Sequence, residues 1–486
     1  MRITMFTLVV ATLASPAIAR EPGITSEPKT VLLKNGSSVI VEAGELRVPE
    51  SRRRPSAREL TIPYYRLRSE AARPASPIFL LHGGPGSSWL EQFPEDNMAR
   101  EVTFYRTIAD VVAFDQRGGG RSRPEMTCPD RKPFPSDRPF SAARVAEVLR
   151  DLAITCRDRW IKAGVDLAAY NTVENAADVN DLRLALGYRK ITLIGGSYGS
   201  HLALQFMRQY PDAVDRVVIF GVEGPDDTWD RPSATLATLG RIAAAAEQSA
   251  AFAGRIPAGG LLKTLERVVK QLEATPQQVS AGQGNTERTV TITADLVRAI
   301  ARRGADRRNP ANAWPEMILA MDRGDFTAAA QTVAGLQNLQ LPDPVHFSMD
   351  CASGISSRRL EAVRKDPARS LLGDQSLEYE AVCPLWPSEN LGESFRANVV
   401  SSAPTLIVHG TWDTSTPIEN ARVAAAALPN SQLLEVIGGN HGALYNLYAR
   451  WPPMYDTMRA FLSGRQATFP ASVDDTPAIR FTPAAK

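Results

Sequence analysis

Ser197 stands in the motif G-G-S-Y-G (195–199), which has the spacing of a serine nucleophile. Residues 191–194 form a short, β-branched apolar run typical of a buried strand, and residues 202–210 have a helical pattern that ends before Pro211. Glycines two positions before and after the serine leave no Cβ to clash, so the chain can turn sharply from strand to helix. The motif therefore predicts a nucleophile elbow that presents the Ser197 hydroxyl above a sheet.

A glycine-rich turn from strand to helix can also serve packing or bind a phosphate. The dinucleotide pattern G-x-G-x-x-G fails here because position 197 is serine, and the Walker A pattern fails because no Gly-Lys-Ser/Thr follows. The choice between a nucleophile and a packing turn therefore depends on whether an acid and a base follow in the chain.

Acyl transfer by a serine needs a base that takes the hydroxyl proton and an acid that orients this base. When the serine lies in such an elbow, the acid and then the base follow it in the chain. Asp413 comes after the apolar run 404–408, and His441 after the run 433–437, so each lies just beyond a predicted strand. Of the five histidines only His441 follows the acid, and Glu419, the local rival of Asp413, starts the next predicted helix. We therefore expect Asp413 and His441 to complete a triad with the serine.

Backbone N–H groups beside the serine are candidates for an oxyanion hole. Tyr198 directly follows the nucleophile, and the loop H-G-G-P-G (82–86) follows another apolar run, 77–81. Backbone donors need close approach, which glycine allows, and we expect the N–H groups of Tyr198 and Gly84 to bind the oxyanion. Either loop alone could be only a tight turn, whereas the two together favour an oxyanion hole.

Several apolar runs separated by helical patterns predict the elements that carry these residues. The runs 77–81 and 111–114 each break at a glycine-rich loop, which is typical of parallel strands with a functional edge. Thr172 is a plausible N-cap for a helix over 173–186. Strands alternating with helices predict a mostly parallel, doubly wound α/β sheet. The alternating stretches 30–48 and 60–67 are expected at its antiparallel edge.

The pattern of buried strands is interrupted after residue 224 by alanine-rich helical segments, such as 236–253 and 261–272, with a predicted loop at 281–285. We interpret this stretch as a mainly helical cap over the active-site edge. The expected organisation is a signal peptide (1–19), the first part of the core (20–224), the cap (225–398), the second part of the core (399–465) and a tail (466–486).

The N-terminal segment has the features of a secretory signal: Arg2, an apolar stretch over 3–13 and small residues at 17–19. A membrane anchor is the alternative, but the apolar run is short and Pro16 interrupts it. We therefore expect a protein exported to the periplasm or secreted, without a membrane anchor. The formal net charge of +2 argues against a nucleic-acid partner, because such partners need a concentrated basic surface.

Four cysteines, Cys128, Cys156, Cys351 and Cys383, fit an oxidising compartment. The chain has no C-x-x-C pair and no H-E-x-x-H motif, so nothing in it indicates a metal site, and nothing indicates an organic cofactor. Three disulfide pairings are possible. We favour Cys128 with Cys156 and Cys351 with Cys383, because each pair closes a local loop.

Together these motifs resemble the α/β-hydrolase family of prolyl iminopeptidases and tripeptidyl aminopeptidases, from about residue 30 to 465. The resemblance rests on HGGPG (82–86), DQRGGGRS (115–122), GGSYGS (195–200), the loop of Asp413, GGNHG (438–442) and CPLWP (383–387). Prolyl iminopeptidases commonly have tryptophan after the nucleophile and cysteine in the DQRG loop. Here these positions are Tyr198 and Gly119, which favours the tripeptidyl branch.

The resemblance implies a serine exopeptidase that removes residues from free peptide N-termini. Such an enzyme must bind an ammonium group, for which a carboxylate in a low-dielectric pocket is suited. Glu223, just beyond the run 217–220, and Asp350 are the candidates, although Glu223 could equally be an ordinary loop residue. A small ester or lactone is the alternative substrate, since the fold supports both reactions. A binding protein without turnover is a third possibility, which the triad order disfavours, and the oligomeric state is left open.

Overall fold

The computed structural model describes residues 23–54, 58–133, 139–281, 288–303, 310–335, 338–340, 343–476 and 481. The predicted signal peptide and most of the loop expected at 281–285 lie outside these residues, as does part of the C-terminal tail.

The core of the molecule is a ten-stranded sheet in the order β1-β2-β3-β5-β4-β7-β8-β12-β13-β14. Its antiparallel edge consists of β1 (Gly23–Leu32), β2 (Ser38–Pro49) and β3 (Glu59–Leu67). The parallel part consists of β5 (Val111–Phe114), β4 (Ile78–Leu81), β7 (Ile191–Gly196), β8 (Val214–Phe220), β12 (Thr405–Gly410), β13 (Ser431–Ile437) and β14 (Ser472–Asp474). The predicted fold class, a mostly parallel α/β sheet with an antiparallel edge, is confirmed.

The central strands are apolar on both faces because helices cover both sides of the sheet. Phe79 and Leu193 belong to one hydrophobic cluster, whereas their chain neighbours Leu80 and Ile194 belong to the other. The first cluster includes residues of α4 (Thr172–Ala185), α5 (Tyr198–Gln209) and α16 (Ile418–Ala427), and the second residues of α2 (Asp96–Arg106), α17 (Ala443–Arg450) and α18 (Met454–Leu462). Side chains alternate along a strand, so continuous apolar runs are needed in this layered arrangement.

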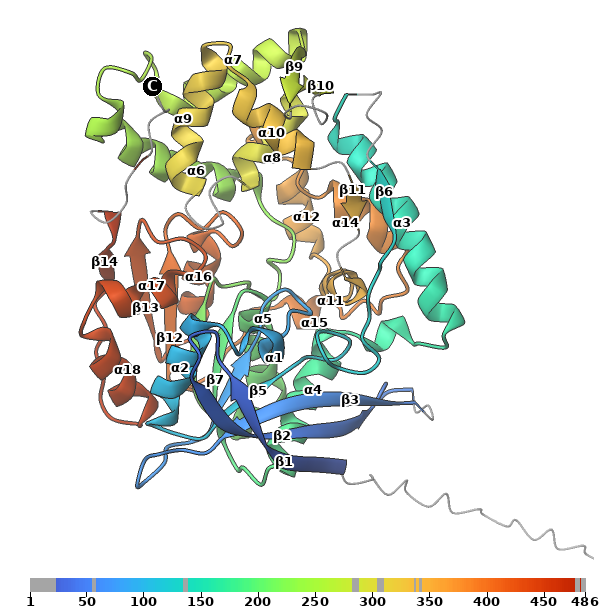
Figure 1. The fold of residues 1–486 in the computed structure, drawn as a ribbon, viewed down its shortest axis with the longest axis vertical. Helices are drawn as coiled ribbons and strands as arrows, with labels where there is room; N and C mark the ends of the chain where they lie inside the picture. The colour runs from blue at the N-terminus through green and yellow to red at the C-terminus, as the bar shows by residue number, and fades with distance from the viewer. Residues whose placement is uncertain are drawn as a thin grey trace, which may run out of the picture.

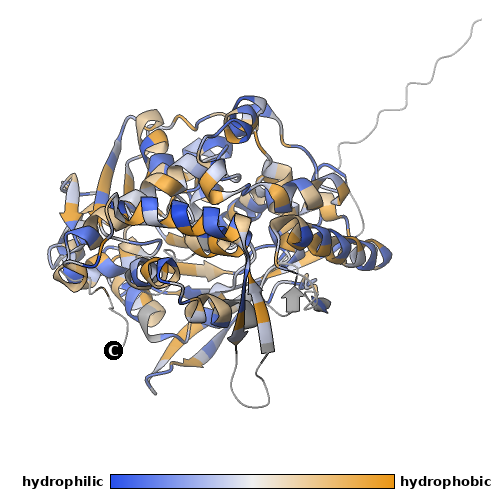
Figure 2. Ribbon diagram, turned by 90° about the horizontal axis from the view of Figure 1, so that it is seen from above, coloured by the Kyte–Doolittle hydropathy of each residue, from blue (hydrophilic) through white to orange (hydrophobic). Residues whose placement is uncertain are grey.

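Most of the remaining helices lie on one side of this sheet, from the top of Figure 1 down to the level of α5. They are α6 (Pro232–Glu247), α7 (Gly260–Ala274), α8 (Ala294–Arg303), α9 (Pro310–Asp322), α10 (Thr327–Gly335), α11 (Pro344–Ser353), α12 (Ser357–Arg364), α13 (Arg369–Leu372), α14 (Leu377–Val382) and α15 (Glu393–Arg396). Helices α6 to α10 enclose a hydrophobic cluster of their own, together with the unpredicted hairpin of β9 (Gln277–Ala281) and β10 (Arg288–Ile292). Hydrophilic and hydrophobic residues alternate along these helices (Figure 2), as expected when each buries one face.

A segment that precedes the nucleophile also joins this helical layer. The long helix α3 (Ala142–Lys162) packs against α14, and β6 (Arg131–Pro133) pairs with β11 (Asn338–Gln340). The structure therefore places residues 131–133 and 139–162, which the sequence pattern assigned to the first part of the core, beside the helices of the cap.

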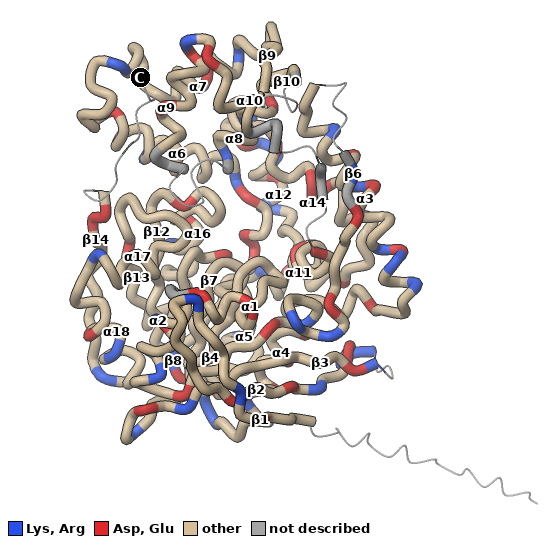
Figure 3. Tube along the Cα trace, in the orientation of Figure 1, with Lys and Arg blue, Asp and Glu red and all other residues tan. Residues whose placement is uncertain are grey.

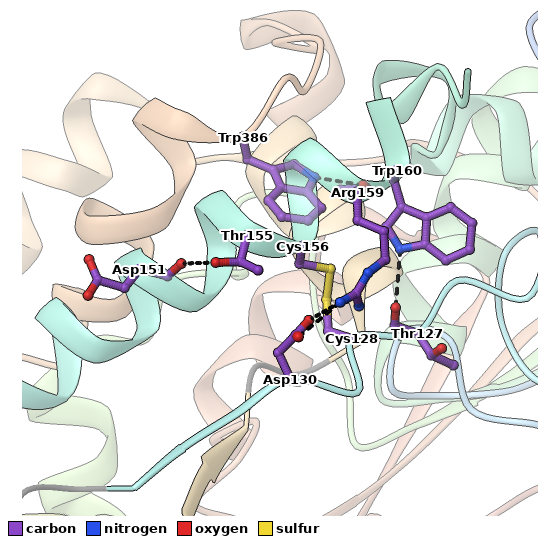
Figure 4. Close-up of a disulfide and its surroundings, with 10 residues drawn as sticks. Thr127, Cys128, Asp130, Asp151, Thr155, Cys156, Arg159, Trp160 and Trp386 are labelled. Carbon is purple, nitrogen blue, oxygen red and sulfur yellow. Dashed lines mark hydrogen bonds and ion pairs between the residues drawn. A yellow bond between two sulfur atoms is a disulfide. The ribbon is translucent and has the colours of Figure 1, made fainter. Parts of the chain in front are cut away.

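Both disulfides have the pairing predicted from the sequence. Cys128 is joined to Cys156 on α3, and Cys351 on α11 is joined to Cys383, with Cα–Cα distances of 5.7 and 5.2 Å. Beside the first bridge, the Trp160 indole N–H donates to the carbonyl oxygen of Thr127 at 3.2 Å (Figure 4). The first bridge ties α3 to the loop before β6, and the second ties α11 to the 3-10 turn Cys383–Leu385.

Charged residues of both signs are interspersed along the described chain rather than separated by sign (Figure 3). Among the described residues, none of the helices has the combination of length and apolar character that crossing a bilayer requires.

Candidate active site

The nucleophile elbow lies between β7 and α5. Ser197 has φ 55° and ψ −131° and is the only non-glycine residue in the described part of the chain with positive φ. A Cβ added to Gly195 would lie 2.2 Å from the carbonyl oxygen of Gly199, and one added to Gly199 would lie 2.2 Å from that of Leu81. Both glycines are therefore required by close approach. Helix α5 begins directly after the serine, four residues earlier than its apolar pattern indicated.

The predicted acid and base are in contact. Asp413, fully buried in the loop after β12, accepts a 2.8 Å hydrogen bond from Nδ1 of His441 on its Oδ2. Its Oδ1 accepts the backbone N–H groups of Ser415 and Thr416 at 3.0 Å each, and Oδ2 also accepts the Thr416 hydroxyl at 2.8 Å. Burial alone would raise the pKa of Asp413, but His441 and these hydrogen bonds outweigh it and hold the pKa below the usual value. The carboxylate therefore stays ionised and fixes the tautomer of the imidazole.

Two glycines allow the close approach of the other site groups. Gly221, at the end of β8 with φ 50°, lies so near the imidazole that an added Cβ would be 2.9 Å from Cε1 of His441. Gly83 faces the nucleophile, since its added Cβ would be 2.9 Å from Cβ and 3.5 Å from Oγ of Ser197.

Sequence reasoning named neither Gly221 nor the acid's partner Thr416. Two local signals could have identified these residues: Gly221 comes at the end of a strand, and Thr416 comes three residues after the acid.

A second histidine lies near the acid but is not placed for catalysis. His409 is buried on β12, with Nε2 3.8 Å from Oδ2 of Asp413 and Nδ1 3.1 Å from the carbonyl oxygen of Gly410. Burial lowers the pKa of His409, so it is held neutral. His441 instead lies beside the cavity that contains the nucleophile.

A cavity of about 570 Å³ brings most of the predicted site residues together. Ser197, His441, the loop residues 82–85, Glu223 and Asp350 all line it. Tyr198 is buried behind the elbow, where its hydroxyl contacts Thr172, Asn175 and Met349. The loop that contains Gly84 is thus beside the serine, and the N–H groups of Gly84 and Tyr198 stay the predicted oxyanion donors.

The two candidate ammonium ligands meet across the boundary between core and cap. Glu223 follows β8, and Asp350 lies on α11. Oδ2 of Asp350 accepts a 2.9 Å hydrogen bond from the hydroxyl of Tyr379 and lies 3.3 Å from Nε2 of His346. Glu223 accepts a 3.3 Å hydrogen bond from the hydroxyl of Thr228. No arginine or lysine among the described residues is paired with either carboxyl group.

Burial is the largest effect on this carboxyl pair. It raises the pKa of Glu223 well above the usual value, and the nearby charge of Asp350 raises it further. Burial also raises the pKa of Asp350, although His346 and Tyr379 oppose that shift. Burial and mutual repulsion therefore both favour the protonated forms of the pair. A cation that enters the cavity would favour the ionised forms.

The match to known proteins agrees with this geometry. A model of the alpha/beta hydrolase fold matches residues 76–446, which is most of the chain. The chain belongs to the α/β-hydrolase family. The resemblance drawn from the motifs is confirmed by the relatives.

Three relatives illustrate the similarity. The chain is 29% identical over 203 residues to a tripeptidyl aminopeptidase of Streptomyces coelicolor, which covers 39% of this chain and 37% of that protein. It is 30% identical over 148 residues to a proline iminopeptidase of Xylella fastidiosa, covering 30% and 32% of the two chains. It is 22% identical over 386 residues to the putative hydrolase YuaR of Escherichia coli K12, covering 75% and 73%. The matches to the two peptidases thus span about a third of their length.

Proposed function

We propose that this α/β-hydrolase is a serine hydrolase that releases residues from the free amino ends of peptides. The observation that carries the proposal is the Glu223–Asp350 pair, two carboxyl groups in the same cavity as Ser197 and His441 that no arginine or lysine of the described chain neutralises. An ester needs no such pair, whereas the ammonium group of a peptide would neutralise it. Peptidases among the relatives support the same substrate class.

The triad supplies the chemistry. Ser197 Oγ attacks the scissile carbonyl carbon while Nε2 of His441 takes the hydroxyl proton, because Nδ1 is held by Asp413. The carbonyl oxygen becomes an oxyanion, which the N–H groups of Gly84 and Tyr198 would each stabilise by about 3 kcal/mol. His441 then passes the proton to the leaving amine, the C–N bond breaks, and an acyl-enzyme is left. Water, activated by the same histidine, hydrolyses the ester and restores the serine.

The carboxyl pair would determine which peptides react. A peptide ammonium placed between Glu223 and Asp350 would form charge-assisted hydrogen bonds, which are stronger in a desolvated site than in water. N-acetylation removes this charge and adds bulk at the same place. Blocked peptides are therefore expected to bind poorly even though their scissile bonds are unchanged.

We also propose that the protein works in an oxidising compartment outside the cytoplasm. The two disulfides and the signal-like pattern of residues 1–19 support export. Cell fractionation tests this, since export predicts a processed chain with oxidised cysteines in the periplasm or medium. A full-length chain with reduced cysteines in the cytoplasm would contradict it.

The experiment that tests the activity compares matched substrates. Prolyl, alanyl and tripeptidyl chromogenic amides, their N-acetylated twins and a short-chain nitrophenyl ester are given to the purified protein and to Ser197→Ala. The proposal predicts turnover of free-amine amides, little turnover of the blocked twins and no turnover by Ser197→Ala. Hydrolysis of the ester alone would retain the triad but overturn the peptidase assignment in favour of an esterase.

A further inference from the structure

A second cavity adjoins the catalytic cavity. Its volume is about 310 Å³, and Asp230, Ser415 and Glu378 line both cavities. Asp230 lies just before α6, Ser415 lies in the loop of the catalytic acid, and Glu378 lies in the first turn of α14. We call the second cavity the side chamber and these three residues its mouth. A substrate bound at Ser197 can thus extend into the side chamber.

The mouth has two carboxyl groups without protein partners. Neither Asp230 nor Glu378 makes a hydrogen bond or an ion pair with the residues that the structure describes. Asp227, close by on the same loop, differs because it forms a 2.6 Å ion pair with Arg359. Burial raises the pKa of Asp230 to about 8, the charge of Arg359 opposes this, and Glu378 is among the carboxylates that add to it. The mouth residues carry no positive charge of their own, and the nearby Arg359 is already paired with Asp227.

The other carboxylates of the side chamber are already satisfied. Asp295 accepts the backbone N–H of Ala142 at 3.0 Å and the guanidinium of Arg298 at 3.2 Å. Asp374 accepts hydrogen bonds from Ser376 and from Arg369. Arg302 also lines the chamber, and it donates a hydrogen bond to the carbonyl oxygen of Leu372. These contacts leave Asp230 and Glu378 as the acceptors available to a ligand.

The walls of the side chamber point to an amphipathic occupant. Apolar side chains line much of it, namely Phe140, Val145, Leu296, Ile300 and Leu377. Thr414, which is only 4% exposed, also lines the chamber, and its Oγ1 is buried without a hydrogen-bond partner among the described residues. A buried hydroxyl without a partner is costly, and a polar ligand atom would satisfy it. A chain of methylene groups that ends in a hydrogen-bonding cation would pack on the apolar walls and supply a partner for the Thr414 hydroxyl.

The side chamber adjoins the loop of the acid that holds His441. Thr414 and Ser415 directly follow Asp413, which holds His441. His441 is the group that returns the proton to the departing amine. The loop 82–85 of the expected oxyanion hole lines only the catalytic cavity. In this arrangement the side chain of the residue after the scissile bond would reach the mouth.

We propose that the side chamber, with Asp230 and Glu378 at its mouth, is a subsite for a basic side chain directly after the scissile bond. The proposal rests on the proposed function and adds a substrate preference to it. A peptide with a free N-terminus brings one positive charge to Glu223 and Asp350, and a lysine or arginine in the second position brings another to the mouth. Its aliphatic stem packs on the apolar walls, and its donors reach the mouth carboxylates and Thr414.

Paired peptides test this subsite. Alanyl-lysyl and alanyl-norleucyl peptides with the same amidated end are compared by the release of alanine, because norleucine retains the stem and lacks the charge. The lysyl peptide should have a kcat/KM at least about tenfold higher, which corresponds to one good charged contact. Asp230→Asn and Glu378→Gln should each bring the ratio of the two kcat/KM values, lysyl over norleucyl, toward one. The two variants are made separately so that one folding failure is not decisive. Glu380→Gln on the same helix is the control, since Glu380 pairs with Arg364 and lines neither cavity, and should keep the ratio.

The outcomes separate this proposal from the proposed function. If both peptides are cleaved equally in a Ser197-dependent and amine-dependent reaction, the subsite is wrong and the aminopeptidase assignment stands. If a lysine preference occurs only with lysyl against norleucyl nitroanilides, the side chain binds before the scissile bond and the leaving-side assignment is overturned. If neither peptide is cleaved while free-amine chromogenic amides are, the subsite is overturned and the proposed function stands, whereas both fail if no free-amine substrate is cleaved.

Discussion

The hydroxyl of Ser200 accepts a 2.9 Å hydrogen bond from the backbone N–H of Glu223. The same hydroxyl donates to the carbonyl oxygen of Ser197 at 2.6 Å. One buried side chain on the first turn of α5 thus connects the nucleophile elbow to the loop that carries a proposed ammonium ligand. This connection holds the backbone of Glu223 in a fixed position relative to the elbow.

Ser200→Ala should weaken the binding of free-amine substrates more than it weakens the chemistry. Loss of the hydroxyl leaves the buried N–H of Glu223 without its partner, which typically costs about 1–3 kcal/mol. We expect KM for an alanyl amide to rise several-fold while kcat for a nitrophenyl ester changes little, as steady-state kinetics on both substrates would show. Ser200→Thr, which keeps the hydroxyl, should restore much of the loss. Equal losses on both substrates would instead indicate a general disturbance of the elbow.

Asp413→Asn should abolish most of the activity without unfolding the protein. The amide cannot hold the Nδ1–H tautomer of His441 as a carboxylate does, and kcat is expected to fall about 10³–10⁴-fold. Glu419→Gln is the matched control, because Glu419 is the nearest acid on the following helix and pairs with Arg241. It should keep near-normal kcat. A Glu419 variant as inactive as Asp413→Asn would contradict the assignment of the acid.

The raised pKa of Glu223 predicts a pH dependence specific to free-amine substrates. Below this raised pKa the carboxyl is protonated and binds an ammonium weakly, so kcat/KM should rise with pH above the ordinary carboxyl range. The pH profile of an ester should show the ionisation of the histidine but lack this additional limb, and Glu223→Gln should remove the limb from the amide profile. The same shift means that stability falls as pH rises from about 4.5 toward the folded pKa, since the folded chain holds the proton more tightly. Identical amide and ester profiles would contradict the role of Glu223.

The local motifs are the part of the site that the sequence predicts well. G-x-S-x-G, the acid loop and the histidine loop each follow a short apolar strand, so the parallel sheet alone brings Ser197, Asp413 and His441 to one edge. Glu223 is predictable for the same reason, because it follows β8 directly.

The residues contributed by the cap are much harder to predict. Asp230 and Glu378 reach the cavity only because the segment before α6 and helix α14 pack over the sheet, and no local pattern specifies that packing. The position of β6 depends in the same way on its pairing with β11, far along the chain. Helix α4 shows a smaller difference: its N-cap is Asn171 rather than Thr172, because the Asn171 side chain accepts the N–H of Glu174 at 3.0 Å. Capping residues adjacent in sequence compete, and side-chain geometry decides between them.

The two disulfides should have similar effects on stability but different effects on substrate binding. They close loops of 28 and 32 residues, so replacing either pair by serines should lower the free energy of unfolding by about 2–4 kcal/mol. Only Cys351 is adjacent to a proposed ammonium ligand, Asp350. The variant without Cys351–Cys383 should therefore also raise KM for free-amine substrates, whereas the variant without Cys128–Cys156 should not. Denaturant unfolding and kinetics on both variants check this, and equal KM values would contradict it.

Covalent labelling tests the central claim most directly. An alanyl phosphonate diphenyl ester with a free amino group mimics the acyl part of the substrate and traps an activated serine, and its N-acetylated twin differs only in the missing charge. Intact-mass measurement and peptide mapping of the labelled protein should show one adduct on Ser197, formed much faster with the free amine, and this difference should shrink in Glu223→Gln. An adduct on another residue, or equal rates for the two reagents, would contradict the account of a Ser197 nucleophile that acts on peptides with a free amino end.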